Sequence, residues 1–393
     1  MTPATDSVAG SPSPLPWYAR PASRAWTCAP PPPGARDFHL SLPGYAPTAL
    51  RELPALAREL SVARVFVKDE STRLGLPAFK ALGASWAIHH ILTRDANDAS
   101  GTVDNRPLRL VTATDGNHGR AVARTAGRLG LRAHVFVPDG VHPEAVTAIE
   151  GEGAEVTRVS GSYDAAVRAA KDAAVTPGAV LVQDMAWDGY EEIPALVVEG
   201  YATLFTEVDA QLGAAGVESP SLVAVPVGVG SLAQAAVTHY RGGRTAGPRS
   251  GGASPSLLSV EPVGAACVLE SLHAGRLTSV PTDVTVMAGL NCGTPSTLAW
   301  PVLRDGLDAA VAVTDAGSMS AARDLAALGV SSGPCGAAAL AGVRAALTGR
   351  GSDGRRTALG VGPEAALVLI STEGATADTR QPEGRTRHQY VQK

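Results

Sequence analysis

The sequence predicts an α/β fold with two open, parallel-type sheets that carry helices on both faces. Short apolar, β-branched runs alternate with helical patterns from residue 37 onward, which is the order that builds parallel sheets. The 393 residues, of which 45% are hydrophobic, are enough for two such sheets. Glycine-rich or polar turns follow several predicted strands directly, and sheets of this kind bind their ligands there.

The predicted strands are short apolar runs, and the predicted helices repeat apolar residues at helical spacing. The strands cover residues 65–67, 108–112, 134–137, 179–182, 222–227, 257–260, 310–313 and 367–370. The helices cover residues 118–129, 163–174, 193–212, 231–240, 318–328 and 337–347. Residues 1–35 are rich in proline, alanine and serine, so we expect an extended segment ahead of the fold.

Composition limits the partners of the chain. A net charge of -4 and a pI near 6.1 argue against nucleic acid. Residues 1–16 lack a signal-peptide pattern, and no apolar run approaches the roughly 18 residues of a membrane helix. The four cysteines are widely spaced and give no metal signature. We therefore expect a soluble cytoplasmic protein that binds no nucleic acid, membrane or metal.

Lys80 is the residue that points most directly to chemistry. It lies on the first turn of a predicted helix, beside Phe79 and Leu82 and close to the end of a predicted strand. A helix N-terminus disfavours a cation. Desolvation should lower the lysine pKa and leave the neutral amine that Schiff-base chemistry requires. The alternative is a surface lysine whose stem packs along the helix.

A glycine-rich turn at residues 228–232 joins a predicted strand to a helix N-terminus, which makes a site for an anion. With Ala233, the turn also matches a dinucleotide-binding fingerprint, which needs an acidic residue about 20 positions further on. Residues 241–256 contain no Asp or Glu, and the first acid is Glu261. A cradle for a monophosphate fits better, and a tight turn that binds nothing is the other alternative.

The loop after residues 108–112 carries Thr114, Asp115, Gly116, Asn117 and His118. These residues could be helix caps, but the loop holds more polar groups than a cap needs. Its backbone N–H groups could hold a carboxylate, and Asn117 could contact a phenolic oxygen. Asp115 would then lie within reach of the reacting carbon of a substrate.

Two further strands end in polar side chains. Asp184 ends the strand near residue 181, either as a cap or as a second acid–base group. Ser371 ends the last predicted strand. A hydroxyl facing a pyridine nitrogen leaves the ring less protonated than a carboxylate would, and this favours elimination over transamination.

Together these segments resemble the fold-type II pyridoxal-phosphate enzymes, and among them the 2,3-diaminopropionate ammonia-lyase family, from about Phe38 to Thr376. The first two motifs are long enough to be specific, whereas the glycine turn alone is not. The motifs are Lys68-Asp69-Glu70-Ser71-x-Arg73-x-Gly75-Leu76-x-Ala78-Phe79-Lys80-x-Leu82-Gly83, Thr114-Asp115-Gly116-Asn117-His118-Gly119-Arg120, Gln183-Asp184-x-Ala186-Trp187-x-Gly189-Tyr190, Ala288-Gly289-Leu290-x-Cys292-Gly293 and Ser371-Thr372-Glu373-Gly374.

The resemblance implies a tryptophan synthase β-like fold, pyridoxal 5'-phosphate as cofactor, an amino acid as substrate and a homodimer. The expected parts are a Pro-rich extension (1–36), a large cofactor-binding domain (37–87 and 200–378), a small domain (88–199) and a polar tail (379–393). The implied reaction is α,β-elimination of ammonia from D- or L-2,3-diaminopropionate, giving pyruvate and ammonia through an aminoacrylate.

Carried over by position, the resemblance makes Lys80 the Schiff-base lysine and Asn117 a contact to the cofactor ring oxygen. Asp115 and Asp184 match the residues that take the α-proton, assigned here to the D and the L enantiomer respectively. The expected substrate contacts are Thr114, Asp115, Gly116 and His118. The expected further cofactor contacts are Gly228, Val229, Gly230, Ser231, Leu232, Ser371 and Thr372. Cys267 and Cys292 match a cysteine pair that can be bridged in the family.

The chain departs from the family pattern at two loops. Thr294 stands where an acidic residue usually precedes Pro295, and Ser331–Gly336 replaces an expected Glu-Ser-Gly run. Each change removes a negative charge that a cationic β-amino group would attract. A serine/threonine dehydratase-like or β-replacement enzyme on another β-substituted amino acid is therefore an alternative. Asp115 opposes an ordinary dehydratase, which has a hydroxyl residue there.

A third hypothesis is a non-catalytic protein that binds a ligand or partner. The joint presence of Lys80, Asp115, Asn117 and Asp184 argues against it.

Overall fold

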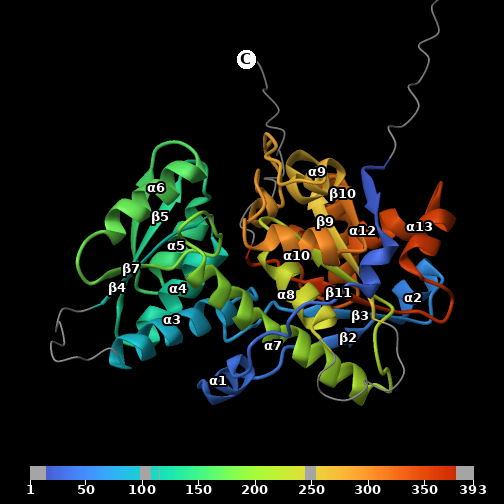
Figure 1. The fold of residues 1–393 in the computed structure, drawn as a ribbon, viewed down its shortest axis with the longest axis horizontal. Coiled ribbons are helices and arrows are strands. Elements are labelled where there is room, and N and C mark those ends of the chain that lie inside the picture. Colours follow the sequence, from blue (N-terminus) through green and yellow to red (C-terminus); the bar gives the residue numbers. More distant parts are fainter. Residues whose placement is uncertain (1–14, 98–107, 115, 244–253, 378–393) are drawn as a thin grey trace, which may run out of the picture.

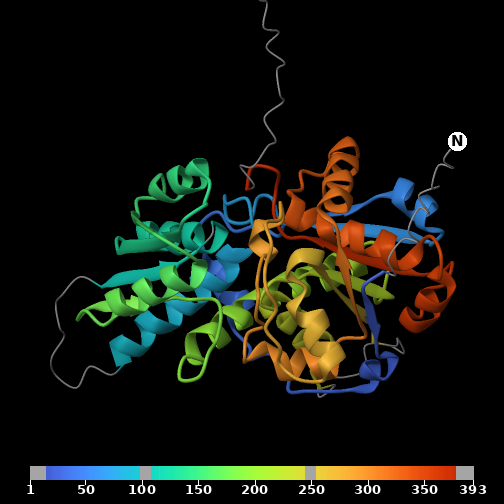
Figure 2. The same cartoon turned by 90° about the horizontal axis from the view of Figure 1, so that it is seen from above.

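The computed structural model describes residues 15–97, 108–114, 116–243 and 254–377, and it contains the two predicted sheets (Figure 1). The sheets lie side by side in both views, each with helices packed around it (Figure 2). The α/β fold class predicted from the alternating pattern is confirmed.

The larger sheet has seven strands in the order β1-β10-β9-β8-β11-β3-β2. The five inner strands run parallel, and the edge strands β1 and β2 pair antiparallel with their neighbours. The strands are β1 (Trp17–Ala19), β2 (Leu50–Glu52), β3 (Arg64–Asp69), β8 (Leu222–Pro226), β9 (Ser256–Pro262), β10 (Ala309–Val313) and β11 (Ala366–Ser371).

The smaller sheet has four parallel strands in the order β6-β5-β4-β7. Its strands are β4 (Arg109–Ala113), β5 (Arg132–Pro138), β6 (Glu155–Val159) and β7 (Ala179–Leu181). The larger sheet has a buried core on each face, and successive residues of one strand alternate between the two. Phe66 lies in one core and Val65 and Val67 in the other, so both faces need apolar residues. This double burial explains the continuous apolar runs in the sequence.

Helices α3 (Lys80–Asn97) and α7 (Glu192–Ala214) pack against each other and extend from the smaller sheet toward the larger one (Figure 1). They approach closely because glycines lie at the crossing. A Cβ atom on Gly200 would lie 2.6 Å from the Leu82 carbonyl oxygen, and one on Gly83 would lie 2.6 Å from Cε1 of Tyr201. This crossing places Lys80, at the start of α3, against the middle of α7.

The remaining helices surround the two sheets, and some of them pack on other helices, as α1 does on α3 and α7. They are α1 (Ala35–Ser41), α2 (Pro54–Leu60), α4 (Asn117–Arg128), α5 (Pro143–Glu150), α6 (Tyr163–Ala174), α8 (Ser231–Arg241), α9 (Cys267–Ala274), α10 (Ala299–Gly306), α11 (Asp315–Ala327), α12 (Pro334–Leu347) and α13 (Ser352–Leu359), with short 3-10 turns at Pro21–Ala25, Val263–Ala265 and Ala288–Leu290. In the larger domain, residues of α8 belong to one core and residues of α12 to the other.

All eight predicted strands and the six predicted helices given by range are present, with ends displaced by a few residues, and the helix predicted to begin at Lys80 is α3. The sequence pattern missed β1, β2 and β6. The first two are three-residue edge strands, and β6 carries Glu155, Thr157 and Arg158, so its apolar signal is weak. Several short helices of seven or eight residues were missed for the same reason, since they show only two turns of periodicity.

The predicted domain limits remain predictions, although the positions of the strands can be compared with them. All strands of the smaller sheet fall within residues 88–199, whereas β1 lies inside the predicted extension of residues 1–36 and joins the larger sheet. The predicted tail, 379–393, lies outside the described residues. No helix in the described part of the chain is both long and apolar enough to cross a membrane.

Candidate active site

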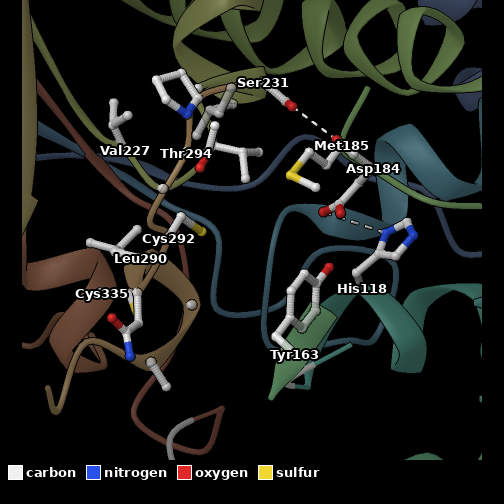
Figure 3. A pocket seen from close by; sticks show the side chains of 18 of the residues that line it. His118, Tyr163, Asp184, Met185, Val227, Ser231, Leu290, Cys292, Thr294 and Cys335 are labelled. Atoms are coloured by element: carbon white, nitrogen blue, oxygen red, sulfur yellow. Dashed lines mark hydrogen bonds and ion pairs between the residues drawn. The ribbon is translucent and has the colours of Figure 1, made fainter. Parts of the chain in front are cut away.

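A cavity of about 810 Å³ lies where the two sheets meet. Its lining follows the carboxyl ends of strands from both sheets, with Thr114 after β4, Asp184 after β7, Gly228 after β8 and Thr372 after β11. Figure 3 shows side chains of the smaller domain, such as Asp184, facing those of the larger domain across it. Parallel sheets of this type bind ligands at these strand ends.

The centre of the cavity is an ion pair in which Lys80 Nζ donates to Asp184 Oδ2. Burial alone would lower the pKa of Lys80, but the attraction of Asp184 raises that pKa above its ordinary value. Burial likewise opposes the charge on Asp184, but His118 and Lys80 hold its pKa below the usual range. The prediction that desolvation leaves Lys80 as a neutral amine is therefore wrong for this structure. The carboxylate partner outweighs desolvation and holds an ammonium.

His118 lies behind this ion pair and is 4% exposed. Burial lowers the pKa of its ring, an effect that the charge of Asp184 opposes, and its Nε2 is 2.8 Å from the Val182 carbonyl oxygen. A carbonyl only accepts, so Nε2 carries a proton. Nδ1 is the nitrogen that faces Asp184, at 3.8 Å from Oδ2 (Figure 3).

The loop between β4 and α4 is shaped by Thr114. Its Oγ1 accepts the backbone N–H of Gly116 at 3.0 Å and of Gly119 at 3.1 Å. The hydroxyl oxygen of Thr114 therefore binds the backbone of its own loop, which is the role that a helix cap would have. Thr114, Gly116, Asn117 and His118 all line the cavity. Asp115, the predicted second base, lies outside the described residues.

The glycine turn before α8 forms a tight wall of the cavity, and all of its residues from Gly228 to Leu232 line it. Gly230 has φ 101°, and a Cβ atom there would lie 2.6 Å from Leu303 Cδ1. A Cβ atom on Gly228 would lie 2.9 Å from Cys292 Sγ. The two glycines thus let the turn pack tightly against Cys292 and Leu303. The turn leads to the N-terminus of α8 at the cavity, which is the place of an anion cradle.

A dinucleotide site would need an acidic residue that faces the ligand, and Glu261, the first acid after the turn, does not face the cavity. Glu261 is fully buried, and its two carboxylate oxygens accept the N–H groups of Val268 and Leu269, each at 2.8 Å. It caps α9 and does not line the cavity. Ser231, by contrast, links the turn to the other domain, because its Oγ donates to the Asp184 carbonyl at 2.9 Å (Figure 3).

The other two predicted cofactor contacts lie at the end of β11. Thr372 lines the cavity, while Ser371 is buried beside it and donates its hydroxyl to Ser332 Oγ at 2.8 Å. That bond uses the Ser371 proton and leaves its lone pairs free to accept from a ring N–H. Asn117 lies at the start of α4 and donates from Nδ2 to Glu373 Oε2 at 2.6 Å.

The comparison with known families agrees with this geometry. Residues 41–361 match the profile described as pyridoxal-phosphate dependent enzyme. This chain belongs to that family. Its cofactor is therefore pyridoxal phosphate, and the fold is that of the fold-type II enzymes, as the motifs implied.

Its relatives include diaminopropionate ammonia-lyases. That of Salmonella typhimurium is 39% identical over 293 residues, 71% of either chain. That of Escherichia coli is 36% identical over 362 residues, 87% of this chain and 88% of the relative. The crystal structure of the Escherichia coli enzyme, in complex with an aminoacrylate-PLP azomethine reaction intermediate, has a TM-score of 0.77 at 34% identity and covers 87% of this chain and 88% of that chain. The resemblance to this family is confirmed.

The residues at the cavity fit pyridoxal phosphate. The glycine turn would hold the phosphate, Lys80 the aldehyde carbon, Asn117 the ring oxygen and Ser371 the ring nitrogen. One buried group also lacks a partner. The Tyr201 hydroxyl lines the cavity, is fully buried and has no hydrogen-bond partner among the described groups. A buried hydroxyl is costly unless it finds a partner, which a polar ligand in this cavity would supply.

Three aromatic or acidic residues at the cavity were not predicted as site residues. Tyr163 accepts from Gln183 Nε2 at 2.6 Å, Tyr201 packs edge-on to Phe79 at 4.8 Å between ring centres, and Glu373 binds Asn117. The first two lie on predicted helices, where helical spacing gives no sign of a functional side chain. Glu373 belongs to the Ser371-Thr372-Glu373-Gly374 motif, and its position directly after a strand is the signal that could have identified it.

Cys267 and Cys292 lie beside the glycine turn, and both are thiols in the structure rather than a disulfide. Cys267 is fully buried, burial raises the pKa of its thiol, and its Sγ donates to the Gly228 carbonyl at 3.7 Å. Cys292 lines the cavity. The pair therefore supports the back of the predicted phosphate cradle.

The two loops that depart from the family pattern also reach the site. Thr294 lines the cavity, and its Oγ1 lies 2.8 Å from Ser279 Oγ, so this wall presents two hydroxyl groups. In the second loop, Ser332 accepts the hydroxyl of Ser371. The wall near Thr294 is therefore polar but uncharged.

Proposed function

We propose that this protein eliminates ammonia from 2,3-diaminopropionate to give pyruvate and ammonia. The observation that carries the proposal is the Lys80–Asp184 ion pair, which lies in a cavity between the two sheets beside a glycine turn at a helix N-terminus. The names of the relatives give the proposal its substrate.

Pyridoxal phosphate, when bound, supplies an aldehyde for amines and an electron sink that stabilises negative charge at the α-carbon of the substrate. The chain supplies the proton chemistry. Lys80 is the amine that would hold the cofactor covalently, and Asp184 keeps a carboxylate within reach of that amine. Because the pKa of Asp184 is held low, it starts as a base rather than an acid.

The two aspartates of the site would act on opposite enantiomers. We assign the α-proton of the L substrate to Asp184 and that of the D substrate to Asp115. The N–H groups of the Thr114–His118 loop would hold the substrate carboxylate, since Thr114 already spans the loop and keeps its backbone in place.

The test is pyruvate release by the purified protein with pyridoxal phosphate and, in parallel, each enantiomer of 2,3-diaminopropionate and of serine. We expect release mainly from diaminopropionate. Release from serine alone would replace the proposal with a dehydratase, which the uncharged Ser279–Thr294 wall would suit. The visible absorption band of the cofactor bound to Lys80 should vanish in Lys80→Ala. A well-folded protein without that band would overturn both enzyme functions.

We also propose that the protein works in the cytoplasm as a homodimer. The resemblance supports the dimer, and the wide spacing of the four cysteines, which gives no disulfide framework, is compatible with the location. Light scattering on the purified protein would test the dimer, and cell fractionation would test the location.

A further inference from the structure

Glu373 is a buried acid at the cavity that has no part in the proposed reaction. It follows β11 directly, lines the cavity and is 4% exposed. Its Oε2 accepts a hydrogen bond from Asn117 Nδ2 at 2.6 Å. The bond joins the end of a strand in the larger sheet to the start of a helix in the smaller domain.

The chemistry of the two side chains determines the direction of this bond. An ionised carboxylate only accepts hydrogen bonds, whereas an asparagine amide can present either its NH₂ group or its oxygen. A carboxylate at this position therefore selects the orientation in which Nδ2 of Asn117 faces Glu373. Nδ2 carries two hydrogens, so the second one remains available to a ligand in the cavity.

The surroundings of Glu373 hold the carboxylate in place. Its backbone carbonyl accepts the N–H of Gly333 at 3.1 Å, and a Cβ atom on Gly333 would lie 2.9 Å from Oε1. Two helices begin next to it, α4 at Asn117 and α12 at Pro334. Helix N-termini stabilise negative charge, so both favour a carboxylate here. The close backbone leaves it little freedom to turn away from Asn117.

We propose that Glu373 is a positioning residue that orients the Asn117 amide, so that Nδ2 donates its second hydrogen to the ring oxygen of pyridoxal phosphate. The inference rests on the role of Asn117 in the proposed function. A hydrogen bond to this oxygen stabilises its negative charge, and the charge of the oxygen affects how strongly the nitrogen linked to Lys80 holds its proton. Glu373 thus acts on the cofactor through Asn117.

The experiment measures the pH midpoint of the visible absorption band of the cofactor-loaded full chain. The variants are Glu373→Gln, Glu373→Asp and Asn117→Ala, and each Glu373 change is also made in the Asn117→Ala background. Glu373→Gln removes the charge and the carboxylate acceptor at nearly constant size. Glu373→Asp keeps the negative charge but shortens the side chain by one methylene, which moves the carboxylate away from Asn117. Glu364→Gln, an exposed acid just before β11, is the matched control for loss of a charge.

If Glu373 acts through Asn117, Glu373→Asp shifts the midpoint in the wild-type background and has little effect in the Asn117→Ala background. The two shifts should differ by about half a pH unit or more, the size expected for coupled neighbours. Glu364→Gln should leave the midpoint unchanged. Equal shifts in both backgrounds would mean that Glu373 acts only through its charge, and would overturn the proposal. No shift in Asn117→Ala itself would also overturn it, since Asn117 would then not touch the ring oxygen.

The result is separate from the outcome for the proposed function. The absorption band requires only bound cofactor, so the coupling can be measured in a protein that turns over no diaminopropionate. The pyruvate assay on the unmodified protein tests the substrate independently.

Discussion

Two charge clusters, one fully buried and one part-buried, lie at the two ends of the motif around residues 68–83, and they differ in how completely their groups are paired. The first joins Lys68, Glu70 and Arg73 to Glu207 of α7, and all four side chains are at most 2% exposed. The second is the Lys80–Asp184 pair. Charges of this kind are costly to remove from water. The second pair lines the cavity described above, and the residues of the first cluster do not.

The first cluster is saturated with hydrogen bonds. Lys68 Nζ has three acceptors at 2.6 to 2.9 Å, which are Glu207, Gln211 and the Thr48 carbonyl. Arg73 binds both carboxylates. By contrast, the Tyr201 hydroxyl beside the second cluster has no partner among the described groups. Buried charge alone is therefore no sign of a catalytic site; buried charge with unused polar groups at a cavity is the better sign.

The largest expected effect breaks the saturated cluster. Glu207→Ala would leave Lys68 and Arg73 buried without their shared carboxylate, and we expect a loss of about 3–5 kcal/mol in unfolding free energy. Urea unfolding measures it. Glu59→Ala, which breaks the part-exposed pair with Arg344, is the control and should cost about 1 kcal/mol or less. Similar losses in the two variants would refute the claim that the buried cluster contributes more to stability than a part-exposed ion pair.

The same cluster should make stability sensitive to acid. Burial would raise the pKa of Glu207, but Arg73 and Lys68 lower it to about 2 from an ordinary 4.5. A lowered folded-state pKa contributes stability that is fully present above pH 4.5 and is lost as pH falls toward 2. The contribution is about 3 kcal/mol. Unfolding free energies between pH 5.5 and 3 should fall more steeply in the wild type than in Glu207→Gln; parallel slopes would contradict this.

At the second cluster the expected effects are on catalysis. Asp184→Asn should lower the turnover of L-diaminopropionate by about 10²-fold or more and that of the D enantiomer much less, because it removes one of two bases. Asp115→Asn should do the opposite, and each variant serves as the control for the other. The assay is pyruvate release from each enantiomer. Equal loss of both enantiomers in both variants would refute the two-base assignment.

The smallest effect compares two tyrosines, of which Tyr45 is half-buried and Tyr201 is buried. Tyr45 donates to Glu207 at 2.6 Å, so Tyr45→Phe should cost about 1–2 kcal/mol of unfolding free energy. Tyr201→Phe removes a hydroxyl without a protein partner in the described structure, so stability should stay level or rise by up to about 1 kcal/mol. Urea unfolding of the two variants measures both. A large loss in Tyr201→Phe would show that its hydroxyl already has a structural role.

The sequence by itself determined the fold class and most of the site. Strands buried on both faces leave continuous apolar runs, and in a parallel sheet the polar residues after those strands must meet at one edge. Asn117, Asp184 and the glycine turn were predicted in this way. Lys80 was predicted from its place at the start of a helix and Thr372 from the family resemblance, and all of these residues line the cavity. The short edge strands were missed because three residues carry too little pattern.

Only the tertiary structure decided how these groups are paired. Lys80 and Asp184 are 104 residues apart, so their ion pair, which reverses the expected direction of the lysine pKa, has no local signal. Asn117 and Glu373 are 256 residues apart and meet only because the two domains pack together. A pKa and an amide orientation depend on neighbours in space, and the sequence pattern of one element records only which face of it is buried.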